Sequence, residues 1–214
     1  MRHFNKSFKM DKIESFLTKL SKRANKNSIN NPYKDPKVLN NLRIYLNILK
    51  NRYYDGVMLV AEAPGYSGCN ITGIPFTTVK ILNEKPHKIF EEIDSDIYKG
   101  ELFGDISGAI IWDYLKDKEN IPLFWNSFPF HPYKKYNKLS NRKPTKSEIE
   151  EGIGYVDDLI SIFKPKVILA LGRYGQQSLQ KIYPDKKIEY IRHPSYGGKE
   201  MFISGMNRSY DTLL

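Results

Sequence analysis

VMLVAEAPGYSGCNITGIPF, residues 57–76, joins an apolar run to an acidic residue and a glycine-rich loop. Its first five residues are apolar and have the length of a buried strand. Glu62 follows directly, and Pro64 and Gly65 then require a sharp turn, because proline fixes φ and glycine permits positive φ. A carboxylate at the carboxyl end of a buried strand, facing such a loop, lies where open α/β sheets bind ligands. Glu62 is therefore the first candidate for a catalytic residue, against the alternative of a solvated glutamate in a polar loop.

Two further segments repeat this pattern. FWNSFPFHP, residues 124–132, and RHPSYGGK, residues 192–199, each follow a short apolar run and place polar side chains beside proline or glycine. Parallel strands bring their carboxyl ends to one edge of a sheet. Three such strand ends therefore predict one composite site.

The rest of the chain alternates short apolar runs with amphipathic segments. Beyond the first strand, at residues 57–61, we expect strands at 121–125, 167–171 and 187–191, and helices at 77–82, 106–116, 145–163 and 172–183. Thr145, with Glu148 three residues later, forms a capping box at the start of the third of these helices. The alternation predicts an α/β fold, a three-layer α/β/α sandwich with a central, mainly parallel four-stranded sheet.

The chain reads as a single domain spanning residues 1–214. Its first part, up to about residue 50, reads as two helices separated by turn-forming residues at 30–36. No internal repeat and no long linker divides the sequence, so we expect these helices to pack on a shared core. Residues 133–142 combine lysines, asparagines and tyrosines without apolar periodicity, which predicts a loop that either contacts a nucleic-acid backbone or is simply solvated.

The composition limits the classes of function. The formal net charge of +10 favours a polyanionic partner, although the abundance of lysine, asparagine and isoleucine explains the charge equally well as compositional bias. The single cysteine, Cys69, excludes a disulfide framework and any cysteine-rich zinc or iron–sulfur site. No segment has the length and apolarity of a membrane span, and the start lacks the apolar core of a signal peptide. We therefore expect a cytoplasmic monomer without membrane contact, metal or other cofactor.

Together, the three segments resemble the uracil-DNA glycosylase superfamily. Residues 62–65 (EAPG) and 73–76 (GIPF) look like the first motif of that family, Asn126 like its base-reading asparagine, and residues 193–195 (HPS) like its second motif. The resemblance covers most of the chain from about Val57 onward. The bacterial branch with the same EAPG motif carries a four-cysteine iron–sulfur cluster, so a chain with one cysteine resembles a cluster-free branch. The resemblance implies an α/β/α fold and a monofunctional DNA glycosylase that hydrolyses the N-glycosidic bond of a pyrimidine.

Two residues are expected to carry this chemistry. Cleavage of an N-glycosidic bond produces a cationic, oxocarbenium-like sugar and a base anion, after the nucleotide has left the duplex stack. The resemblance assigns the sugar side to Glu62, which stabilises the cation and orients or deprotonates the attacking water. His193 is expected to donate a hydrogen bond to O2 of the base as charge grows there. The structural alternatives are a glutamate that caps a helix and a histidine packed in the core.

Three residues are expected to bind the base. The amide of Asn126 matches uracil in one orientation and cytosine in the other, or else Asn126 forms a turn. Phe76 stacks on the flipped base or fills the core. Gly65 stands where the best-known uracil-specific branch has a tyrosine that excludes a methyl group at C5, although Tyr66 or Phe76 could close the same space. Uracil is the default expectation, and a 5-modified pyrimidine, as in foreign DNA, is the second.

The second motif is followed by a loop of small and basic residues that is expected to contact DNA. Ser195, Gly197 and Lys199 suit close approach of a phosphate. Tyr196 is a candidate wedge for the vacated stack, at a place where the family usually has an apolar residue. His131 is expected to line the mouth of the pocket or to contact phosphate.

The competing hypothesis is a catalytically inactive glycosylase-fold module that binds DNA or a protein partner. The joint presence of Glu62, Asn126 and His193 argues against it. A nucleotide-binding α/β protein is excluded, because neither G-x-x-x-x-G-K-[ST] nor G-x-G-x-x-G follows a strand.

Overall fold

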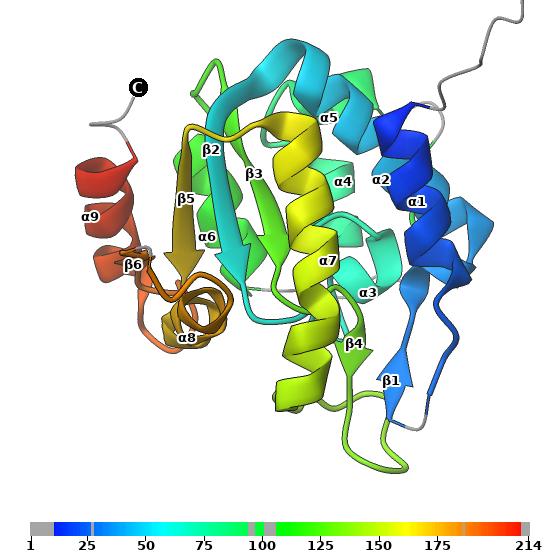
Figure 1. Cartoon of the computed structure of the whole chain (residues 1–214). Coiled ribbons are helices and arrows are strands. Elements are labelled where there is room, and N and C mark those ends of the chain that lie inside the picture. The colour runs from blue at the N-terminus through cyan, green and yellow to red at the C-terminus, as the bar shows by residue number, and fades with distance from the viewer. Residues whose placement is uncertain (1–10, 27, 94–96, 101–105, 186, 211–214) are drawn as a thin grey trace, which may run out of the picture.

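The computed structural model describes residues 11–26, 28–93, 97–100, 106–185 and 187–210 (Figure 1). Its helices are α1 (Lys12–Lys22), η1 (Pro32–Lys34), α2 (Pro36–Ile48), η2 (Leu49–Tyr53), α3 (Cys69–Thr72), α4 (Val79–Glu84), α5 (Ile89–Glu92), α6 (Ile106–Leu115), α7 (Lys146–Phe163), α8 (Arg173–Ile182) and α9 (Lys199–Ser209). Its strands are β1 (Ile29–Asn30), β2 (Tyr54–Ala61), β3 (Ile121–Asn126), β4 (His131–Pro132), β5 (Val167–Leu171) and β6 (Glu189–Ile191). The first ten residues, predicted as part of the helical start, lie outside the described residues.

A four-stranded parallel sheet in the order β3-β2-β5-β6 forms the middle layer. In the view of Figure 1, α7 and α8 lie in front of this sheet and α6 lies behind it. All of β3, and β2 from Gly56 onward, are buried, which explains why both strands read as continuous apolar runs. The predicted α/β fold with a parallel four-stranded sheet is confirmed.

The helices begin where their capping residues predict. The Thr145 hydroxyl accepts a hydrogen bond from the Glu148 N–H, and the Glu148 carboxylate accepts one from the Thr145 N–H, so the predicted capping box starts α7. Asp11 and Asp35 cap α1 and α2 with single bonds, in which their carboxylates accept from the N–H groups of Ile13 and Lys37. The buried faces of α1 and α2 join the strands in one apolar core.

Several elements differ from the sequence prediction, among them the short helices α3 and α5, which were not predicted. β2 begins at Tyr54, earlier than the apolar run that predicted it. Lys199, expected in a loop, is the first residue of α9, which the sequence analysis did not predict. His131 lies in β4, which pairs with β1 in a small antiparallel sheet. Within the described ranges, no helix combines the length and apolarity needed to cross a membrane.

Candidate active site

The carboxyl ends of β2 and β3 lie side by side. Ala61 at the end of β2 pairs with Asn126 at the end of β3. Beyond them, the Ser127 N–H donates to the carbonyl of Ala61 at 2.8 Å and the Phe128 N–H donates to the carbonyl of Glu62 at 3.0 Å. These two bonds extend the contact between the strands into the loops, so Glu62 and Asn126 stand at neighbouring strand ends.

Phe76 and His193 come together from opposite ends of the sequence. Phe76 has a φ of 54°, and its ring centroid lies 5.9 Å from that of His193 and 5.5 Å from that of Phe124. Phe124 is fully buried in β3, whereas Phe76 is half-buried. On the far side, a Cβ at Gly108 of α6 would lie 2.3 Å from the carbonyl oxygen of Phe76, so only glycine permits this approach. Phe76 thus lies between the core and His193.

The residues around His193 fix the orientation of its ring. The backbone N–H of Ser195 donates to Nδ1 of His193 at 3.2 Å, and Oγ of Ser195 lies 2.8 Å from the same nitrogen. A ring nitrogen that accepts from a backbone N–H carries no proton, so the neutral ring holds its proton on Nε2. The guanidinium of Arg192 donates to the carbonyls of His193 and Ser195 at 2.8 and 3.4 Å, which braces the loop.

Asn126 is the polar group whose surroundings most clearly indicate a ligand. It is only 5% exposed, yet its side-chain amide has no hydrogen-bond partner in the part of the chain that the structure describes. The amide is not among the fully enclosed side-chain atoms that lack a partner, so it keeps access to solvent. A largely buried asparagine whose amide makes no hydrogen bond within the protein and still reaches solvent can form hydrogen bonds with a molecule that enters the site.

Glu62 lies in an environment that perturbs its ionisation. It is half-buried, and burial raises the pKa of its carboxyl group, while the positive charge of Lys143 acts in the opposite direction. The ammonium of Lys143 donates to the hydroxyl of Tyr174 and lies 3.7 Å from the centroid of that ring. Tyr174 belongs to the first turn of α8, and Gly172 is the residue just before this helix. A Cβ added at Gly172 would lie 3.2 Å from Cβ of His193, so the start of α8 also lies beside His193.

Lys143 and Tyr174 are thus site residues that the sequence analysis missed. Lys143 lies in the connection to α7 and Tyr174 in α8, and no motif or spacing relates either residue to the end of β2. Only the order of the strands, with β5 beside β2, brings α8 to this edge of the sheet.

Gly65 faces the side chain of Asn141. A Cβ added at Gly65 would lie 3.7 Å from Nδ2 and 3.9 Å from Oδ1 of Asn141, which is ordinary van der Waals contact. The same Oδ1 accepts a hydrogen bond from the Tyr66 N–H at 3.1 Å. Gly65 is not among the glycines with positive φ, so this turn does not require glycine for its backbone conformation. A side chain at position 65 fits without backbone strain.

The loop before α9 presents its residues to solvent. Tyr196 is 97% exposed at a φ of 51°. Gly197 has a φ of 70°, with open space where a Cβ would stand. Lys199 is exposed, whereas Ser195 is half-buried against His193.

The structure corrects the prediction for His131. This side chain is 1% exposed, with Nδ1 3.0 Å from the carbonyl oxygen of Pro64 and Nε2 3.2 Å from that of Lys138. Its ring also stacks on Tyr133. A ring enclosed between two carbonyl groups does not reach a phosphate. His131 instead joins the loop after β2 to the loop that follows β4.

Potential metal and thiol chemistry is limited in the described residues. No three His, Cys, Asp or Glu side chains among them gather as metal ligands would. Cys69 is buried in α3 with its Sγ 3.6 Å from the hydroxyl of Tyr33, and burial raises the pKa of its thiol to about 12. The thiol is therefore protonated and unreactive at neutral pH.

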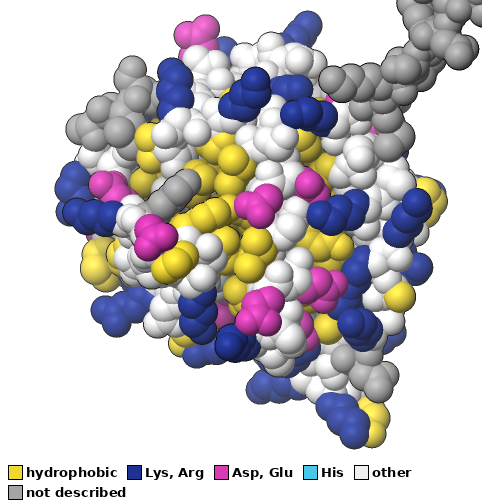
Figure 2. All heavy atoms as spheres, viewed as in Figure 1, with side chains coloured by type: hydrophobic (Ala, Val, Ile, Leu, Met, Phe, Trp, Pro, Cys, Tyr) yellow, Lys and Arg dark blue, Asp and Glu magenta, His cyan; other side chains and the backbone are white. Residues whose placement is uncertain are grey.

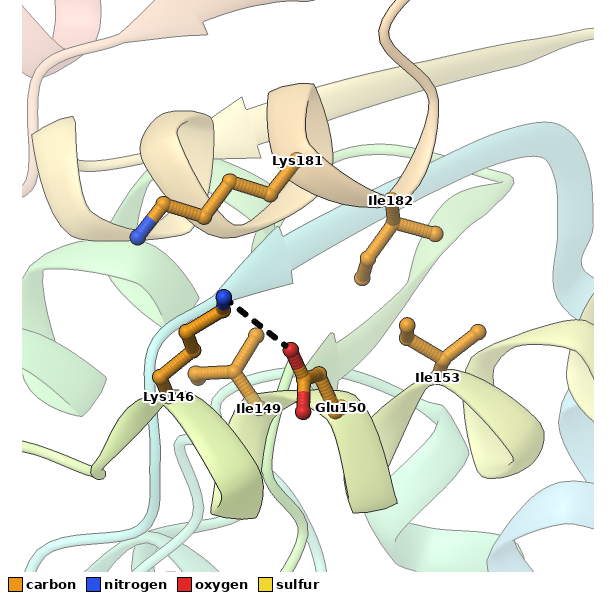
Figure 3. Close-up of a pocket in the computed structure, with 6 residues that line it drawn as sticks. All are labelled: Lys146, Ile149, Glu150, Ile153, Lys181 and Ile182. Carbon is orange, nitrogen blue, oxygen red and sulfur yellow. Dashed lines mark ion pairs between the residues drawn. The ribbon is translucent and has the colours of Figure 1, made fainter.

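A cavity of about 420 Å³ lies away from these residues, between α7 and α8 (Figure 3). Its walls are Lys146, Ile149, Glu150, Ile153, Lys181 and Ile182. The polar groups at its rim include an ion pair of 3.8 Å between Lys146 and Glu150. None of the predicted site residues lines this cavity, so we assign the chemistry to the strand ends.

Comparison with known proteins matches a long part of the chain that includes the three segments. Residues 53–202, which include all of them, match the family model of the uracil DNA glycosylase superfamily. Among solved structures, the chain is similar to wild-type SMUG2 of Pedobacter heparinus, with a TM-score of 0.69 and 17% sequence identity over 95% of this chain and 98% of that chain. At this level of identity the likeness concerns the fold alone. No curated protein sequence matches the chain.

Proposed function

Since the chain belongs to the uracil-DNA glycosylase superfamily and is therefore a DNA glycosylase, a hydrolase of N-glycosyl bonds, we propose that it removes a pyrimidine from DNA and leaves an abasic site. The proposed enzyme is monofunctional and flips the target nucleotide out of the stack before cleavage. It acts as a cytoplasmic monomer and uses neither an iron–sulfur cluster nor another cofactor.

The observation that carries this proposal is the unpaired amide of Asn126. It is buried at a strand end beside Glu62, and the rings of Phe76 and His193 lie together at the same edge of the sheet. A carboxamide, an aromatic face and a histidine donor are the groups that a flipped pyrimidine requires. A module that only bound DNA would not need these three groups together at one set of strand ends.

The proposed reaction moves charge from the sugar to the base. The bond between C1′ of the sugar and N1 of the base breaks, and its electron pair stays with the base. His193 donates from Nε2 to O2, where negative charge develops. The carboxylate of Glu62 stabilises the cationic sugar and accepts a proton from water, whose oxygen bonds to C1′. The base anion then takes up a proton from water and Glu62 returns its proton to water, which leaves a free base, an abasic site and the original carboxylate.

We test the proposal by direct identification of the released base. The protein is incubated with oligonucleotides that contain uracil or a series of 5-modified uracils and cytosines, and the released base is identified by mass spectrometry. We expect uracil to be released by default and a 5-modified pyrimidine as the second choice, the latter fitting a role in defence against foreign DNA. Intact oligonucleotides throughout, with DNA binding retained, would support the inactive binding module instead.

The same reactions test the monofunctional assignment. A lyase needs an amine nucleophile near the sugar. The structure adds Lys143 to the amines to consider, because its charge acts on Glu62, but its ammonium is engaged by the hydroxyl of Tyr174. We therefore expect borohydride to trap no covalent protein–DNA complex, and a trapped complex would contradict this part of the proposal.

Replacement of Lys143 by Met is expected to shift the acid limb of the pH–rate profile to higher pH. The positive charge lowers the pKa of Glu62 against the effect of burial, so its loss raises that pKa further. Activity that requires the ionised carboxylate is lost as the pH falls through this pKa, hence the loss begins at a higher pH in the variant. The measurement is kcat/KM between about pH 4 and 8.

Two variants control for this shift. Lys143→Arg keeps the charge and should retain the wild-type limb, and Lys146→Met removes an exposed lysine from the start of α7 without affecting Glu62. If the acid limb of the pH–rate profile stays in place in Lys143→Met, Lys143 does not influence the ionisation of the group that controls turnover.

Replacement of Gly65 by Tyr is expected to narrow the substrate range. If Gly65 lines the C5 edge of the base, the new ring blocks 5-substituents and leaves uracil release intact, since the position accepts a side chain without backbone strain. The measurement is single-turnover release of uracil and of 5-substituted bases by the variant and by Gly65→Ala. Equal losses for all bases would place Gly65 away from C5.

A further inference from the structure

The segment between β4 and α7, residues 133–143, forms a projection that we call the tongue. In Figure 1 it extends below the carboxyl ends of the strands, on the side opposite α9. Its tip carries two of the most exposed large apolar side chains in the described residues, Tyr136 at 90% and Leu139 at 66%. Exposed apolar side chains are common one at a time, so these two are informative only together with the shape and the charge of the tongue.

The tongue has a defined shape. The Asn137 N–H donates to the carbonyl of Lys134 at 2.9 Å, its Oδ1 accepts from the Leu139 N–H at 3.1 Å, and Oγ of Ser140 accepts from the Lys134 N–H at 3.0 Å. Tyr136, between these residues, has a φ of 66°, a conformation that side chains seldom adopt without a reason. The turn thus holds the ring of Tyr136 away from the body of the protein.

The base of the tongue is tied to the candidate site. Nε2 of His131 lies 3.2 Å from the carbonyl oxygen of Lys138, and Nδ1 of the same ring lies 3.0 Å from that of Pro64, in the loop after Glu62. Asn141 accepts from the backbone of Tyr66 in that loop. On the other side, the guanidinium of Arg142 donates to both oxygens of Glu148 at 2.7 Å.

The charge of the tongue is entirely positive. Residues 133–143 contain four lysines and one arginine and no acidic residue. Arg142 is neutralised by Glu148, but Lys134, Lys135 and Lys138 have no ion-pair partner among the described residues. Figure 2 shows the tip of this projection covered by Lys or Arg side chains beside a hydrophobic one. Lysines next to an exposed aromatic ring are the combination that binds single-stranded nucleic acid, through phosphate contacts and base stacking.

We propose that the tongue binds the DNA strand beside the flipped nucleotide, with Tyr136 stacked on an unpaired base and the three lysines on phosphates. This inference rests on the proposed function, because it takes the strand ends as the place where DNA is held. Tyr196, the other highly exposed tyrosine, precedes α9 in the chain. In Figure 1 the tongue and α9 lie on opposite sides of the sheet, and in our proposal the DNA strand passes between the tongue and the loop before α9.

The test measures DNA binding independently of base release. Fluorescence anisotropy with a labelled oligonucleotide that lacks any target base gives Kd for single-stranded and duplex forms at several salt concentrations. Tyr136→Ala is expected to weaken single-strand binding about 5- to 150-fold, the range found for loss of one stacked base, with a smaller effect on duplex DNA. Tyr136→Phe keeps the ring and should bind like the wild type.

Charge is tested with two matched triple variants. The tongue triple variant carries Lys134→Gln, Lys135→Gln and Lys138→Gln. Each phosphate contact contributes about 0.7 to the slope of log K for single-strand binding against log salt, so the slope should become shallower by about 2. The control is a second triple variant that removes the same charge, with Lys50→Gln, Lys166→Gln and Lys187→Gln. These exposed lysines precede β2, β5 and β6, so they lie toward the amino ends of the strands, away from the site. This control should keep the slope.

Two outcomes overturn the proposal: wild-type binding by Tyr136→Ala and the tongue triple variant, or an equal loss in the control triple variant. The probe contains no target base, so a wild-type protein that releases no base still gives a binding result. Failure of the tongue and failure of the proposed reaction are therefore distinguishable.

Discussion

Glu62→Gln is expected to lower turnover by about two orders of magnitude or more while DNA binding survives, because the substitution removes negative charge that acts only as the sugar becomes cationic. Glutamine has nearly the same shape, and the backbone carbonyl of Glu62 still accepts from the Phe128 N–H. The half-buried position strengthens the effect, since a charge at a partly desolvated site acts through less water. The measurement is single-turnover base release at saturating enzyme, with Kd determined separately.

The controls separate charge from structure. Glu62→Ala should lose at least as much activity, while Glu84→Gln changes an exposed glutamate on α4 and should leave turnover unchanged. Equal melting temperatures would show that the variants fold. Wild-type-like turnover by both Glu62 variants would remove Glu62 from the mechanism.

The sequence predicted the elements that local rules determine. The buried strands are apolar runs, the capping box at Thr145 starts α7 where expected, and the alternation of strands with helices predicted the parallel sheet. It also predicted that polar residues follow the strand ends, and the register of Ala61 with Asn126 brings two of those ends together. These features depend on neighbours in the sequence or on the common direction of parallel strands.

The errors concern contacts between distant segments. His131 follows the same strand as Asn126 and was expected to line the mouth of the pocket or to contact phosphate. The pairing of β4 with β1 and the carbonyls of Pro64 and Lys138 enclose it instead. Lys143 was not predicted as a site residue, because only the fold brings its positive charge close enough to act on Glu62. α9 was missed because two of the four residues on its buried face, Gly205 and Ser209, are small and not apolar, so only Phe202 and Met206 mark the helical spacing.

His193→Ala is expected to slow base release by a factor that corresponds to roughly 2–4 kcal/mol, the usual loss when a donor to a developing oxyanion is removed. The Ser195 N–H donates to Nδ1 and leaves the ring proton on Nε2, so the neutral ring is prepared as a donor before substrate binds. Ser195→Ala removes only the hydroxyl, which lies 2.8 Å from Nδ1, and keeps the backbone donor that defines this tautomer. The serine variant should therefore lose much less activity than the histidine variant.

A change of leaving group distinguishes this role of His193 from a structural one. A more acidic base, such as 5-fluorouracil, carries the departing negative charge with less help, so the loss caused by His193→Ala should shrink when 5-fluorouracil replaces uracil. If His193 served only to pack against Phe76, its loss would disturb Phe76 in the same way for either base. Both substrates would then be slowed by the same factor. The measurement is the ratio of single-turnover rates, wild type over variant, for the two bases in otherwise identical DNA. If that ratio is the same for both bases, His193 does not stabilise the leaving base, and its contacts with Ser195 and Phe76 serve only to hold the loop.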